Sequence, residues 1–532
     1  MKFILINGIK LALGEKEETL AAKAAAALKI KADDIKELEI VRKSLDARRH
    51  RPPFFIYLLR VGIPASVQLS RQPKIGIQVS QAEELREMPR ISPVPSPKLP
   101  VVIMGSGPAG LFAAYRLAQR GIFPFILERG EPIEKRIKDV EAFWKTGMLN
   151  PQSNVFFGEG GAGTFSDGKL TSRSKDPQSH SVKEILVEMG ASSEILVETK
   201  PHIGTDKLRR VIVNLRKKLM DMGCRVEFNA RATDFIIKNG QINSIIVNKK
   251  EEIITNHLIL AMGQSADDTY TKLYQRGVPM ESKPFAMGVR IEHPQALINS
   301  IQYGKWRKHP QLPPAEYFVK ASLPGLNRSV YTFCMCPGGT VIACSADHGS
   351  LITNGMSNSR RSGEFANSAV VVNVRVDDFA GTIDPLAGLA FRKIWEQKAF
   401  AEGGSNYCAP AQKTTDFLKN KISDKLSRTS FLPGLQSADL HQVLPEFAGI
   451  ALKQGICEFD KNMSGFVSEE SILIGVETRT SSPLRICRGK DGQSTSVRGI
   501  YPCGEGAGYA GGIISSAVDG IKAAQNLINN IS

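Results

Sequence analysis

The sequence predicts an α/β protein with three parts: a small N-terminal α/β domain, a discontinuous Rossmann-like domain, and an α+β domain inserted into the latter. Three observations predict this class. A strand, a glycine-rich turn, a helix and a second strand follow one another from residue 101. Two further strand-like segments, HLILAMG and RGIYPCG, come much later in the chain, and many short strand patterns lie between them.

Composition sets the expected boundaries. The stretch ISPVPSPKLP has four prolines in ten residues and no apolar periodicity, which is typical of a semi-rigid linker. Before it, FILINGIKL and FFIYLLRVGI are typical of strands and TLAAKAAAALK of a helix. The predicted parts are an N-terminal domain (1–90), a linker (91–98), the Rossmann-like domain in two pieces (99–280 and 485–532) and the inserted domain (281–484).

With 532 residues, 42% of them hydrophobic, the chain is long enough for several buried cores. No apolar run reaches the roughly 18 residues of a membrane span. FILINGIKL is interrupted by Asn7 and Lys10, which favours a strand over a signal sequence. The eight cysteines are dispersed, unlike those of a disulfide scaffold, so we expect reduced thiols and a cytoplasmic protein.

The net charge of +16 and the pI near 9.4 make nucleic acid or an anionic membrane partners to consider. The basic residues are dispersed, however, and the tightest cluster lacks a stacking-aromatic pattern. We expect this cluster to be a solvated face or a domain contact, with a polyanion site as the alternative, and we disfavour a nucleic acid partner. It comprises Arg42, Lys43, Arg48, Arg49, His50 and Arg51.

The pattern G-x-G-x-x-G occurs three times, in MGSGPAG, GEGGAG and GEGAGYAG. Only the first stands in a complete βαβ unit, between the strand VVIMG and the helix LFAAYRLAQRG, with a second strand that ends at Glu128. The second match is followed by a polar, glycine-broken segment. The third precedes a helix after which the chain ends, so neither is an independent nucleotide site.

The first match predicts a dinucleotide site, with a plain glycine-rich βα turn as the alternative. Its glycines allow close approach of a pyrophosphate, and the helix N-terminus offers free N–H groups. Glu128 follows Gly110 by 18 residues, close to the spacing of about 20 for an acid that meets the adenosine ribose.

HLILAMG and RGIYPCGEGAGYAGGI resemble segments of the two-dinucleotide-binding flavoprotein superfamily, which implies FAD as the cofactor. Met262 replaces the usual threonine of the first segment, and Glu505 the usual aspartate of the second. The terminal helix would place N–H groups near flavin N1 and O2. GEGGAGTFSDG is then expected to be a flavin-side loop, with a flexible surface turn as the alternative. The implied FAD-binding residues are Gly105, Gly107, Ala109, Gly110, Glu128, Arg129, Gly161, Gly163, Thr164, Ala261, Gly263, Gly504, Glu505, Gly511, Gly512 and Ile513.

A closer resemblance covers nearly the whole chain. GEGGAGTFSDGKL, PHIGTDKLR, FCMCPGG, NGMS and CGEGAGYAGGI occur in this order behind the small N-terminal domain. In this they resemble a family of bacterial FAD-dependent dehydrogenases that has no assigned substrate. The resemblance implies FAD and a redox role, but no particular reaction.

The inserted domain is expected to bind the substrate, and it holds the most reactive-looking stretch, Cys334-Met-Cys336. On a strand these two thiols point to one face. Three interpretations stay open: structural cysteines, a redox or nucleophilic thiol at Cys336, and a Cys3His metal site with Cys344 and His348, whose spacing departs from usual zinc sites. We predict no metal.

Two further residues are catalytic candidates beside Cys336. Asn354 lies in the polar stretch TNGMSNSRR, expected to be a loop that either binds an anionic substrate or is simply solvated. His202, a candidate proton donor, precedes a helix that Thr205 or Asp206 is expected to cap.

These observations predict an FAD-dependent oxidoreductase, a dehydrogenase that passes a hydride between a small-molecule substrate and flavin N5. An RNA-modifying flavoprotein is the first alternative, and a flavin-binding regulator that senses redox state through Cys336 is the second. The sequence specifies neither the substrate, nor the electron partner, nor the oligomeric state.

Overall fold

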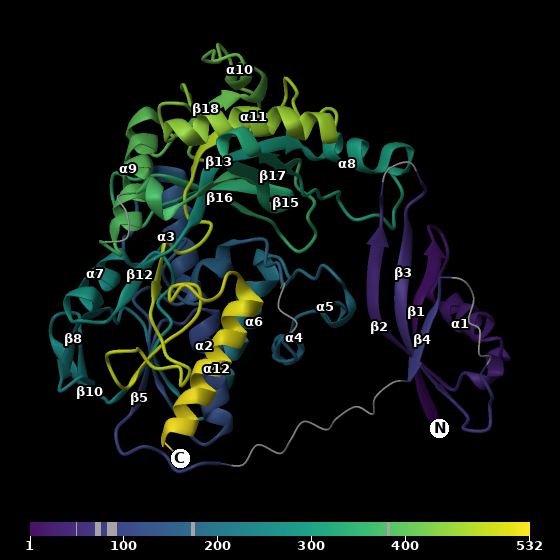
Figure 1. Cartoon of the computed structure of the whole chain (residues 1–532), viewed down its shortest axis with the longest axis horizontal. Helices are drawn as coiled ribbons and strands as arrows, with labels where there is room; N and C mark the ends of the chain where they lie inside the picture. Colours follow the sequence, from purple (N-terminus) through teal and green to yellow (C-terminus); the bar gives the residue numbers. More distant parts are fainter. Residues whose placement is uncertain (49–50, 70–75, 82–92, 172–175, 380–382, 532) are drawn as a thin grey trace.

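The structure is a computed structural model that describes residues 1–48, 51–69, 76–81, 93–171, 176–379 and 383–531 (Figure 1). Residues 91 and 92 of the expected linker, and Arg49 and His50 of the basic cluster, lie outside the described residues. The rest of the linker, 93–98, forms neither helix nor strand.

The N-terminal domain is a four-stranded antiparallel sheet in the order β2-β3-β1-β4, with one α-helix packed on it. Buried residues Leu20, Ala24 and Leu28 of the helix share a core with Ile4 and Ile6 of the sheet. The strands and helix expected here are present, and β2, whose many charged residues hide its alternation, is an additional strand. The elements are β1 (Lys2–Ala12), α1 (Leu20–Leu28), β2 (Glu37–Asp46), β3 (Phe54–Ile63) and β4 (Gln78–Gln81).

The basic cluster near β2 pairs with protein groups. Arg48 and Arg51 both form ion pairs with Asp46, the last residue of β2. The carbonyl of Lys43 accepts hydrogen bonds at 3.0 Å from the backbone N–H and the hydroxyl of Thr199, which follows the short helix α5 (Glu194–Val197). Part of the cluster therefore lies at a domain contact.

The Rossmann-like domain is built on a five-stranded parallel sheet in the order β22-β11-β5-β6-β7. Its strands are β5 (Val101–Met104), β6 (Phe125–Leu127), β7 (Arg225–Glu227), β11 (His257–Leu260) and β22 (Ile500–Pro502). Because β22 comes from the far end of the chain and pairs with β11, the domain is discontinuous, as the sequence predicts. The predicted fold class is confirmed.

Alternate residues of this sheet face different layers, as expected for strands buried on both sides. Val101 and Ile103 pack on a helical layer, whereas Val102 and Met104 pack on the other side, toward a three-stranded antiparallel sheet. Figure 1 shows the main helices α2 and α12 side by side. The helical layer contains α2 (Pro108–Gln119), α4 (Gln178–Glu188), α6 (Thr205–Asp221) and α12 (Ile513–Ile531), and the small sheet contains β8 (Ala232–Lys238), β9 (Gln241–Val247) and β10 (Glu251–Ile254).

The inserted domain is an α+β unit with an eight-stranded, mostly antiparallel sheet in the order β14-β15-β17-β13-β20-β18-β19, to which β16 is added beside β15. Helix α11 covers one side, and its buried Leu452 and Ile456 share a core with Val330 and Val370 (Figure 1). The strands are β13 (Phe285–Pro294), β14 (Lys320–Leu323), β15 (Arg328–Cys344), β16 (Ile352–Met356), β17 (Phe365–Val374), β18 (Ala409–Lys413), β19 (Leu435–Ser437) and β20 (Ile472–Glu477). The helices are α8 (Gln295–Tyr303), α9 (Ala387–Glu402), α10 (Thr414–Leu418) and α11 (Glu446–Asn462).

Two short antiparallel strands, β12 (Met280–Ser282) and β21 (Leu484–Ile486), pair where the chain leaves the Rossmann-like domain and where it returns. Helix α7 (Asp267–Gln275) packs beside the parallel sheet, on the side of the small antiparallel sheet. Helix α3 (Ile133–Thr146) begins in the helical layer at Ile133 and packs Val140, Phe143 and Trp144 against the inserted domain.

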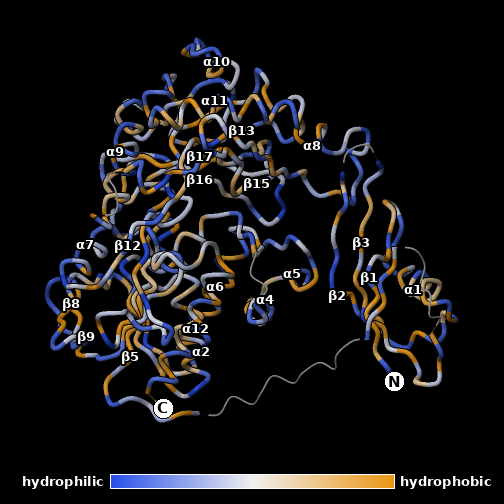
Figure 2. The backbone as a smooth tube through the Cα atoms, viewed as in Figure 1, coloured by the Kyte–Doolittle hydropathy of each residue, from blue (hydrophilic) through white to orange (hydrophobic). Residues whose placement is uncertain are grey.

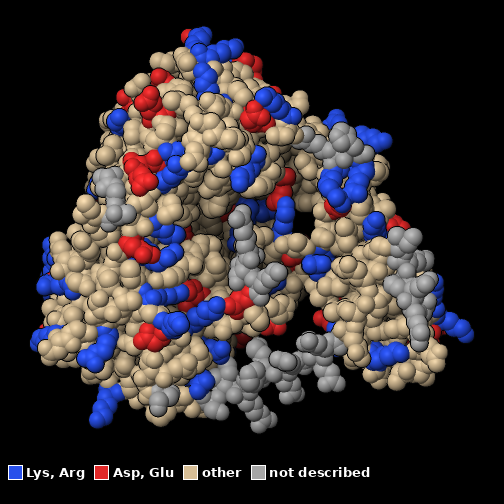
Figure 3. All heavy atoms as spheres, viewed as in Figure 1, with Lys and Arg blue, Asp and Glu red and all other residues tan. Residues whose placement is uncertain are grey.

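Apolar segments, orange in Figure 2, gather along the strands around β5. On the face in Figure 3, acidic and basic residues are interspersed rather than segregated. Within the described ranges, no helix is both long and apolar enough to cross a membrane.

Candidate functional site

The turn between β5 and α2 combines two tightly packed glycines with one that faces open space. Gly105 has a φ of +105°, and a Cβ there would overlap the Ala261 carbonyl. A Cβ on Gly110 would overlap the Gly105 carbonyl. A Cβ on Gly107, at the N-cap of α2, would meet only the Cα of Gly161, at 3.8 Å. The turn therefore leaves room beside Gly107 and the helix N-terminus, where a pyrophosphate would fit.

The second glycine-rich stretch lies directly against this turn. The Gly160 N–H donates to the Ser106 carbonyl at 3.0 Å, and the short 3-10 helix Gly161–Phe165 follows. The buried guanidinium of Arg136, on α3, donates to the carbonyls of Gly158, Glu159 and Gly161. Because Arg136 and the turn hold it, this segment is fixed inside the protein. We call residues 158–165 the internal loop.

The third glycine-rich stretch completes the same region from the C-terminal side. A Cβ on Gly163 would lie 3.3 Å from Cγ1 of Ile513, the first residue of α12, and a Cβ on Gly504 would lie 2.8 Å from Cβ of Ala109. In contrast, Cβ atoms on Gly511 and Gly512 would meet nothing within 4 Å. Gly263, after β11, is equally open. The structure thus brings all three glycine-rich motifs together around exposed backbone.

Glu128, at the end of β6, accepts four hydrogen bonds from protein groups. They come from the Ser106 N–H (2.9 Å) and hydroxyl (2.8 Å) and from the N–H groups of Gly130 and Gly158 (both 3.0 Å). The carboxylate therefore ties the turn to the internal loop, and a ribose hydroxyl would share oxygens that are already engaged.

Arg129, the next residue, turns toward α7. Its guanidinium donates to Asp268 at 3.1 Å and to Gln152 at 3.1 Å, and it lies 3.9 Å from the ring centroid of Phe157. Through these contacts Arg129 links the end of β6 to α7 and to Gln152.

Glu505 is half-buried beside the open backbone of Gly512. Gln264 donates to its Oε1 at 2.7 Å. Burial raises the pKa of Glu505 to about 7, against the lowering effects of the Gly512 N–H, Lys283 and Gln264. The side chain can hold or release a proton near neutral pH.

Thr164 and Ala261 are placed by backbone contacts. The buried Thr164 hydroxyl donates to the Glu159 carbonyl at 3.0 Å, and the Thr164 carbonyl accepts from the Thr205 hydroxyl at 2.7 Å. The Ala261 N–H donates to Met104 at 2.9 Å. Both residues therefore hold the internal loop and the end of β11 in place.

His202 lies beside the inserted domain, with Nε2 3.1 Å from the Ser359 carbonyl oxygen. Burial lowers its pKa, and the nearby Arg361 lowers it further. The expected cap of the next helix is wrong: Gly204 is the N-cap of α6, and Thr205 donates instead to the internal loop. Asp206 accepts hydrogen bonds from Ser359.

Asn354 requires a second correction, because the first half of TNGMSNSRR is the strand β16 rather than a loop. Its polar residues pair with the end of β15, which satisfies their backbone groups in a ladder. The loop begins at Ser357. The Asn354 side chain accepts from the Gly355 N–H at 2.7 Å.

Cys334 and Cys336 lie in β15 among charged residues that the sequence motifs did not single out. Lys169 donates to the Met335 carbonyl, and Arg290 donates to the Cys334 carbonyl at 2.8 Å. Lys169 and Arg290 are paired with Asp167 and Glu477 respectively. The motif GEGGAGTFSDGKL contains both Asp167 and Lys169. The polar end of this motif was therefore the sequence signal from which these two charged residues could have been singled out.

The other members of the suggested metal site do not join the pair. Cys344 is buried in a separate apolar cluster, and His348 is exposed. Across the described residues, no group of three or more His, Cys, Asp or Glu side chains is placed to hold a metal ion.

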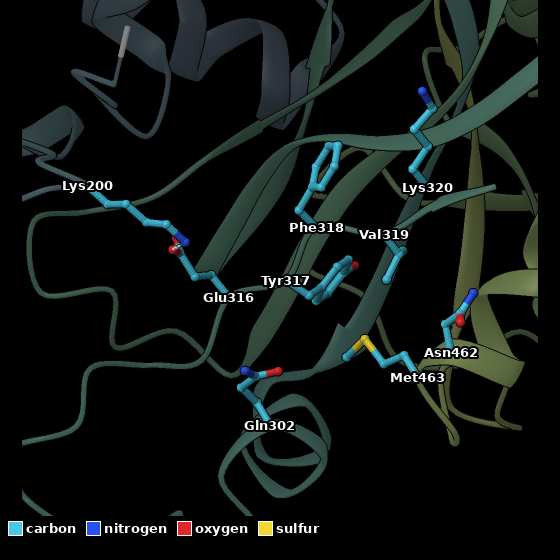
Figure 4. Close-up of a pocket in the computed structure, with 9 residues that line it drawn as sticks. All are labelled: Lys200, Gln302, Glu316, Tyr317, Phe318, Val319, Lys320, Asn462 and Met463. Atoms are coloured by element: carbon cyan, nitrogen blue, oxygen red, sulfur yellow. Dashed lines mark hydrogen bonds and ion pairs between the residues drawn. The ribbon is translucent and has the colours of Figure 1, made fainter. Parts of the chain in front are cut away.

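Away from the glycine-rich motifs, a cavity of about 530 Å³ opens between Lys200 and the inserted domain (Figure 4). Lys200 and Glu316 form an ion pair at its edge. Tyr317, Phe318 and Met463 also line it, and none of the implied FAD-binding residues does.

Comparison with known proteins identifies relatives along the chain. Residues 284–480 match a family model described as "FAD-dependent protein, C-terminal domain-like", and residues 3–62 match a domain of unknown function. A protein of Clostridium beijerinckii described as "Uncharacterized protein" is 44% identical over 532 residues, which cover 99% of this chain and 98% of that protein. The chain belongs to the same family as this clostridial protein.

Solved flavoproteins show a more distant likeness. A glycerol-3-phosphate dehydrogenase from Bacillus halodurans complexed with FAD is 9% identical, with coverage of 81% of this chain and 64% of that chain and a TM-score of 0.34. A glycine oxidase from Bacillus cereus is 11% identical, with coverage of 82% and 96% and a TM-score of 0.31. FAD is the cofactor that the matching family model names and that the open glycine backbone fits.

Proposed function

We propose that this chain is an FAD-dependent oxidoreductase that passes a hydride between a small-molecule substrate and flavin N5. The observation that carries the proposal is the open backbone at Gly107, Gly263, Gly511 and Gly512, gathered at one region from three separate motifs. At Gly107 and Gly511, close approach of the backbone to a ligand is a physical reason to keep side chains out, whereas Gly263 and Gly512 also have positive φ angles that favour glycine. The N-termini of α2 and α12 add N–H groups that favour anionic charge.

Different residues of the glycine-rich region would contact different parts of FAD. Gly107 and the start of α2 would face the pyrophosphate, Glu128 the adenosine ribose, and Gly511 with Gly512 the flavin ring. Bound FAD supplies the hydride chemistry. Glu505, whose pKa is raised to about 7, can keep a proton at this end of the site near neutral pH.

The substrate is proposed to bind where the inserted domain meets the internal loop. His202, Asp167 and Lys169 come from the Rossmann-like domain, and Ser359 and Arg361 come from the inserted domain. Lys169 and His202 also pair through their backbones. Such a set of polar groups at a domain boundary suits a small polar molecule.

A small molecule is favoured over RNA because charges of both signs are mixed over the face in Figure 3. We also propose a cytoplasmic location, since all eight cysteines are free thiols in the structure.

The visible spectrum of the purified protein tests the proposal. We expect an oxidised flavin spectrum that bleaches on anaerobic addition of dithionite, and denaturation that releases FAD. Release of FMN alone, or no flavin uptake after incubation with FAD, would contradict the proposal.

A further inference from the structure

Cys334 and Cys336 are held together by an irregularity in β15. The pairing of β15 with β17 shifts register between Phe333 and Cys336, and Cys334 has a φ of +47°. This left-handed backbone is uncommon for a residue with a side chain. It brings the Cys336 Sγ within 3.4 Å of the Cys334 carbonyl oxygen. Cys336 is fully buried, whereas Cys334 is half-buried.

Two cations face these sulfurs. Arg290 Nη2 lies 3.8 Å from the Cys336 Sγ, and Lys169 Nζ lies 4.0 Å from it. Arg290 is fully buried on β13, and its other hydrogen bonds go to Asn367 at 3.0 Å and Glu477 at 2.9 Å. Positive charge beside a thiol favours the thiolate.

The acids in the same cluster limit this effect without removing it. Asp167 is paired with Lys169 at 2.6 Å and also with Arg361. Burial raises the pKa of Glu477 to about 7, although Arg290 lowers it. In the thiol pair, the hydrogen bond between the two side chains lowers the pKa of Cys334 to about 6, and Lys169 and Arg290 lower it further against the effect of burial. The same hydrogen bond and burial raise the pKa of Cys336, although Lys169 lowers it. The two nearby cations and the hydrogen bond between the side chains therefore favour a thiolate that the two sulfurs share with one proton, the state from which thiol–disulfide exchange starts.

The cluster is also tied to the proposed flavin site. Lys169 follows the 3-10 helix Gly161–Phe165 by a few residues, and that helix packs on Gly107. Gly355, next to Asn354, has no room for a Cβ because the Arg290 guanidinium and the Asn367 amide occupy that space. Gly355 thus lets β16 pack directly against the guanidinium that faces the Cys336 sulfur.

We propose that Cys334 and Cys336 form a redox-active dithiol that exchanges two electrons with the bound FAD. On oxidation the two thiols lose two protons and two electrons, and one S–S bond forms between them. The two electrons and one proton are taken up by oxidised FAD, which becomes its reduced anionic form, and the second proton leaves to solvent. This inference rests on the proposed function, because FAD is the electron partner.

Electron counting on the FAD-loaded, full-length protein tests the proposal. After air oxidation, anaerobic titration with dithionite is expected to consume about four electrons per FAD, two for the flavin and two for the disulfide. Cys334→Ser and Cys336→Ser are each expected to consume about two electrons per FAD. Cys344→Ala and Cys457→Ser, which change a buried and an exposed cysteine outside the cluster, are expected to match the unchanged protein.

Thiol labelling gives a second measurement that does not depend on flavin chemistry or on the folding of a variant. In the unchanged protein, alkylation under denaturing conditions after oxidation should spare the two cysteines of the peptide around Phe333–Pro337, and a prior reduction should restore both. Consumption of about two electrons by the unchanged protein, with both cysteines alkylated after oxidation, would overturn the dithiol while leaving the flavoprotein proposal intact. A protein that binds no FAD would instead contradict the proposed function.

Discussion

The Gly160 N–H donates to the Ser106 carbonyl at 3.0 Å and thereby joins two glycine-rich motifs that lie 54 residues apart in the sequence. The same Ser106 gives its own N–H and hydroxyl to Glu128. Glu128 in turn accepts from the Gly158 N–H. The turn after β5, the end of β6 and the internal loop therefore form one hydrogen-bonded unit.

This unit explains why three G-x-G-x-x-G patterns occur in a chain with one nucleotide-binding sheet. The first provides the turn and the helix N-terminus, the second the loop against that turn, and the third the approach to α12. Gly110 packs backbone against backbone, and Gly107 leaves backbone open. Gly158 and Gly160 make room for the side chains of Arg136 and Thr164. A glycine pattern can thus mark close approach within the protein as well as a nucleotide.

Gly107→Val should abolish FAD retention while the protein stays folded. In the structure a Cβ at this position has 3.8 Å of space, but the added side chain would occupy the room proposed for the pyrophosphate. Flavin content and thermal unfolding check this. Gly325→Val is the matched control, because Gly325 also faces open space but lies far from the turn in sequence, in a short 3-10 helix of the inserted domain. Normal flavin content in folded Gly107→Val would show that the pyrophosphate lies elsewhere.

Arg136→Met should loosen the internal loop and lower both stability and FAD retention. Arg136 is fully buried and donates to five carbonyls: those of Asn154, Val155, Gly158, Glu159 and Gly161. Leaving buried carbonyls without donors should lower the free energy of unfolding by about 3–5 kcal/mol.

Denaturant unfolding and flavin content check the Arg136 prediction. Lys135→Met is the control, since Lys135 is the neighbouring residue of α3 and its side chain is 69% exposed. Equal stability of the two variants would mean that the loop holds itself without Arg136.

Glu505 should make stability depend on pH. Its pKa is raised from 4.5 to about 7, so the protonated form is favoured in the folded protein. The stabilisation it contributes is present in full below pH 4.5 and is lost as pH rises through about 7. Lys283, the Gly512 N–H and Gln264 face the carboxyl and oppose this shift.

In the unchanged protein, the free energy of unfolding should therefore fall as the pH rises from about 5.5 to 8.5, and Glu505→Gln should remove the part of this fall that comes from Glu505. We expect the difference from the unchanged protein to be about 1–2 kcal/mol, because the half-buried carboxylate keeps some hydration. Unfolding curves at several pH values measure it, and Glu477→Gln is a useful comparison, since that pKa is also raised to about 7. Parallel pH profiles for Glu505→Gln and the unchanged protein would contradict the shift.

The sequence predicts four of the five strands of the parallel sheet because these four are short, largely apolar and followed by glycine turns. The fifth strand, β7, reads Arg-Val-Glu and is not predicted. VVIMG, PFILERG, HLILAMG and RGIYPCG all became strands of the one sheet, and β22 supports the discontinuous organisation. Periodicity and glycine spacing are local signals, which one chain displays without reference to its fold. For the same reason the polar strands β2 and β16 are not visible in the sequence.

The contacts of charged residues with the thiols, unlike the strands of the parallel sheet, could not be predicted from the sequence. Arg290 lies 46 residues before Cys336, and Lys169 lies 167 residues before it. Only the pairing of β13, β17 and β15, together with the packing of the internal loop, brings them together. No spacing rule in the sequence encodes such a contact, so the environment of Cys336 follows from the fold alone.

NADH and NADPH should reduce the flavin slowly or not at all. A dedicated nicotinamide domain needs a second parallel sheet with its own glycine turn, and within the described part of the chain the other sheets are antiparallel apart from the β18–β19 pair. The sheet of the inserted domain is mostly antiparallel, and this domain carries polar groups that are proposed to meet the substrate. Anaerobic stopped-flow mixing should therefore show flavin bleaching slower than about 1 s⁻¹, the low end of ordinary enzyme turnover. Dithionite, mixed in the same way, is the control that the flavin can be reduced. Saturable bleaching by micromolar NADPH at more than about 10 s⁻¹ would mean that a nicotinamide docks over the flavin without a Rossmann fold of its own.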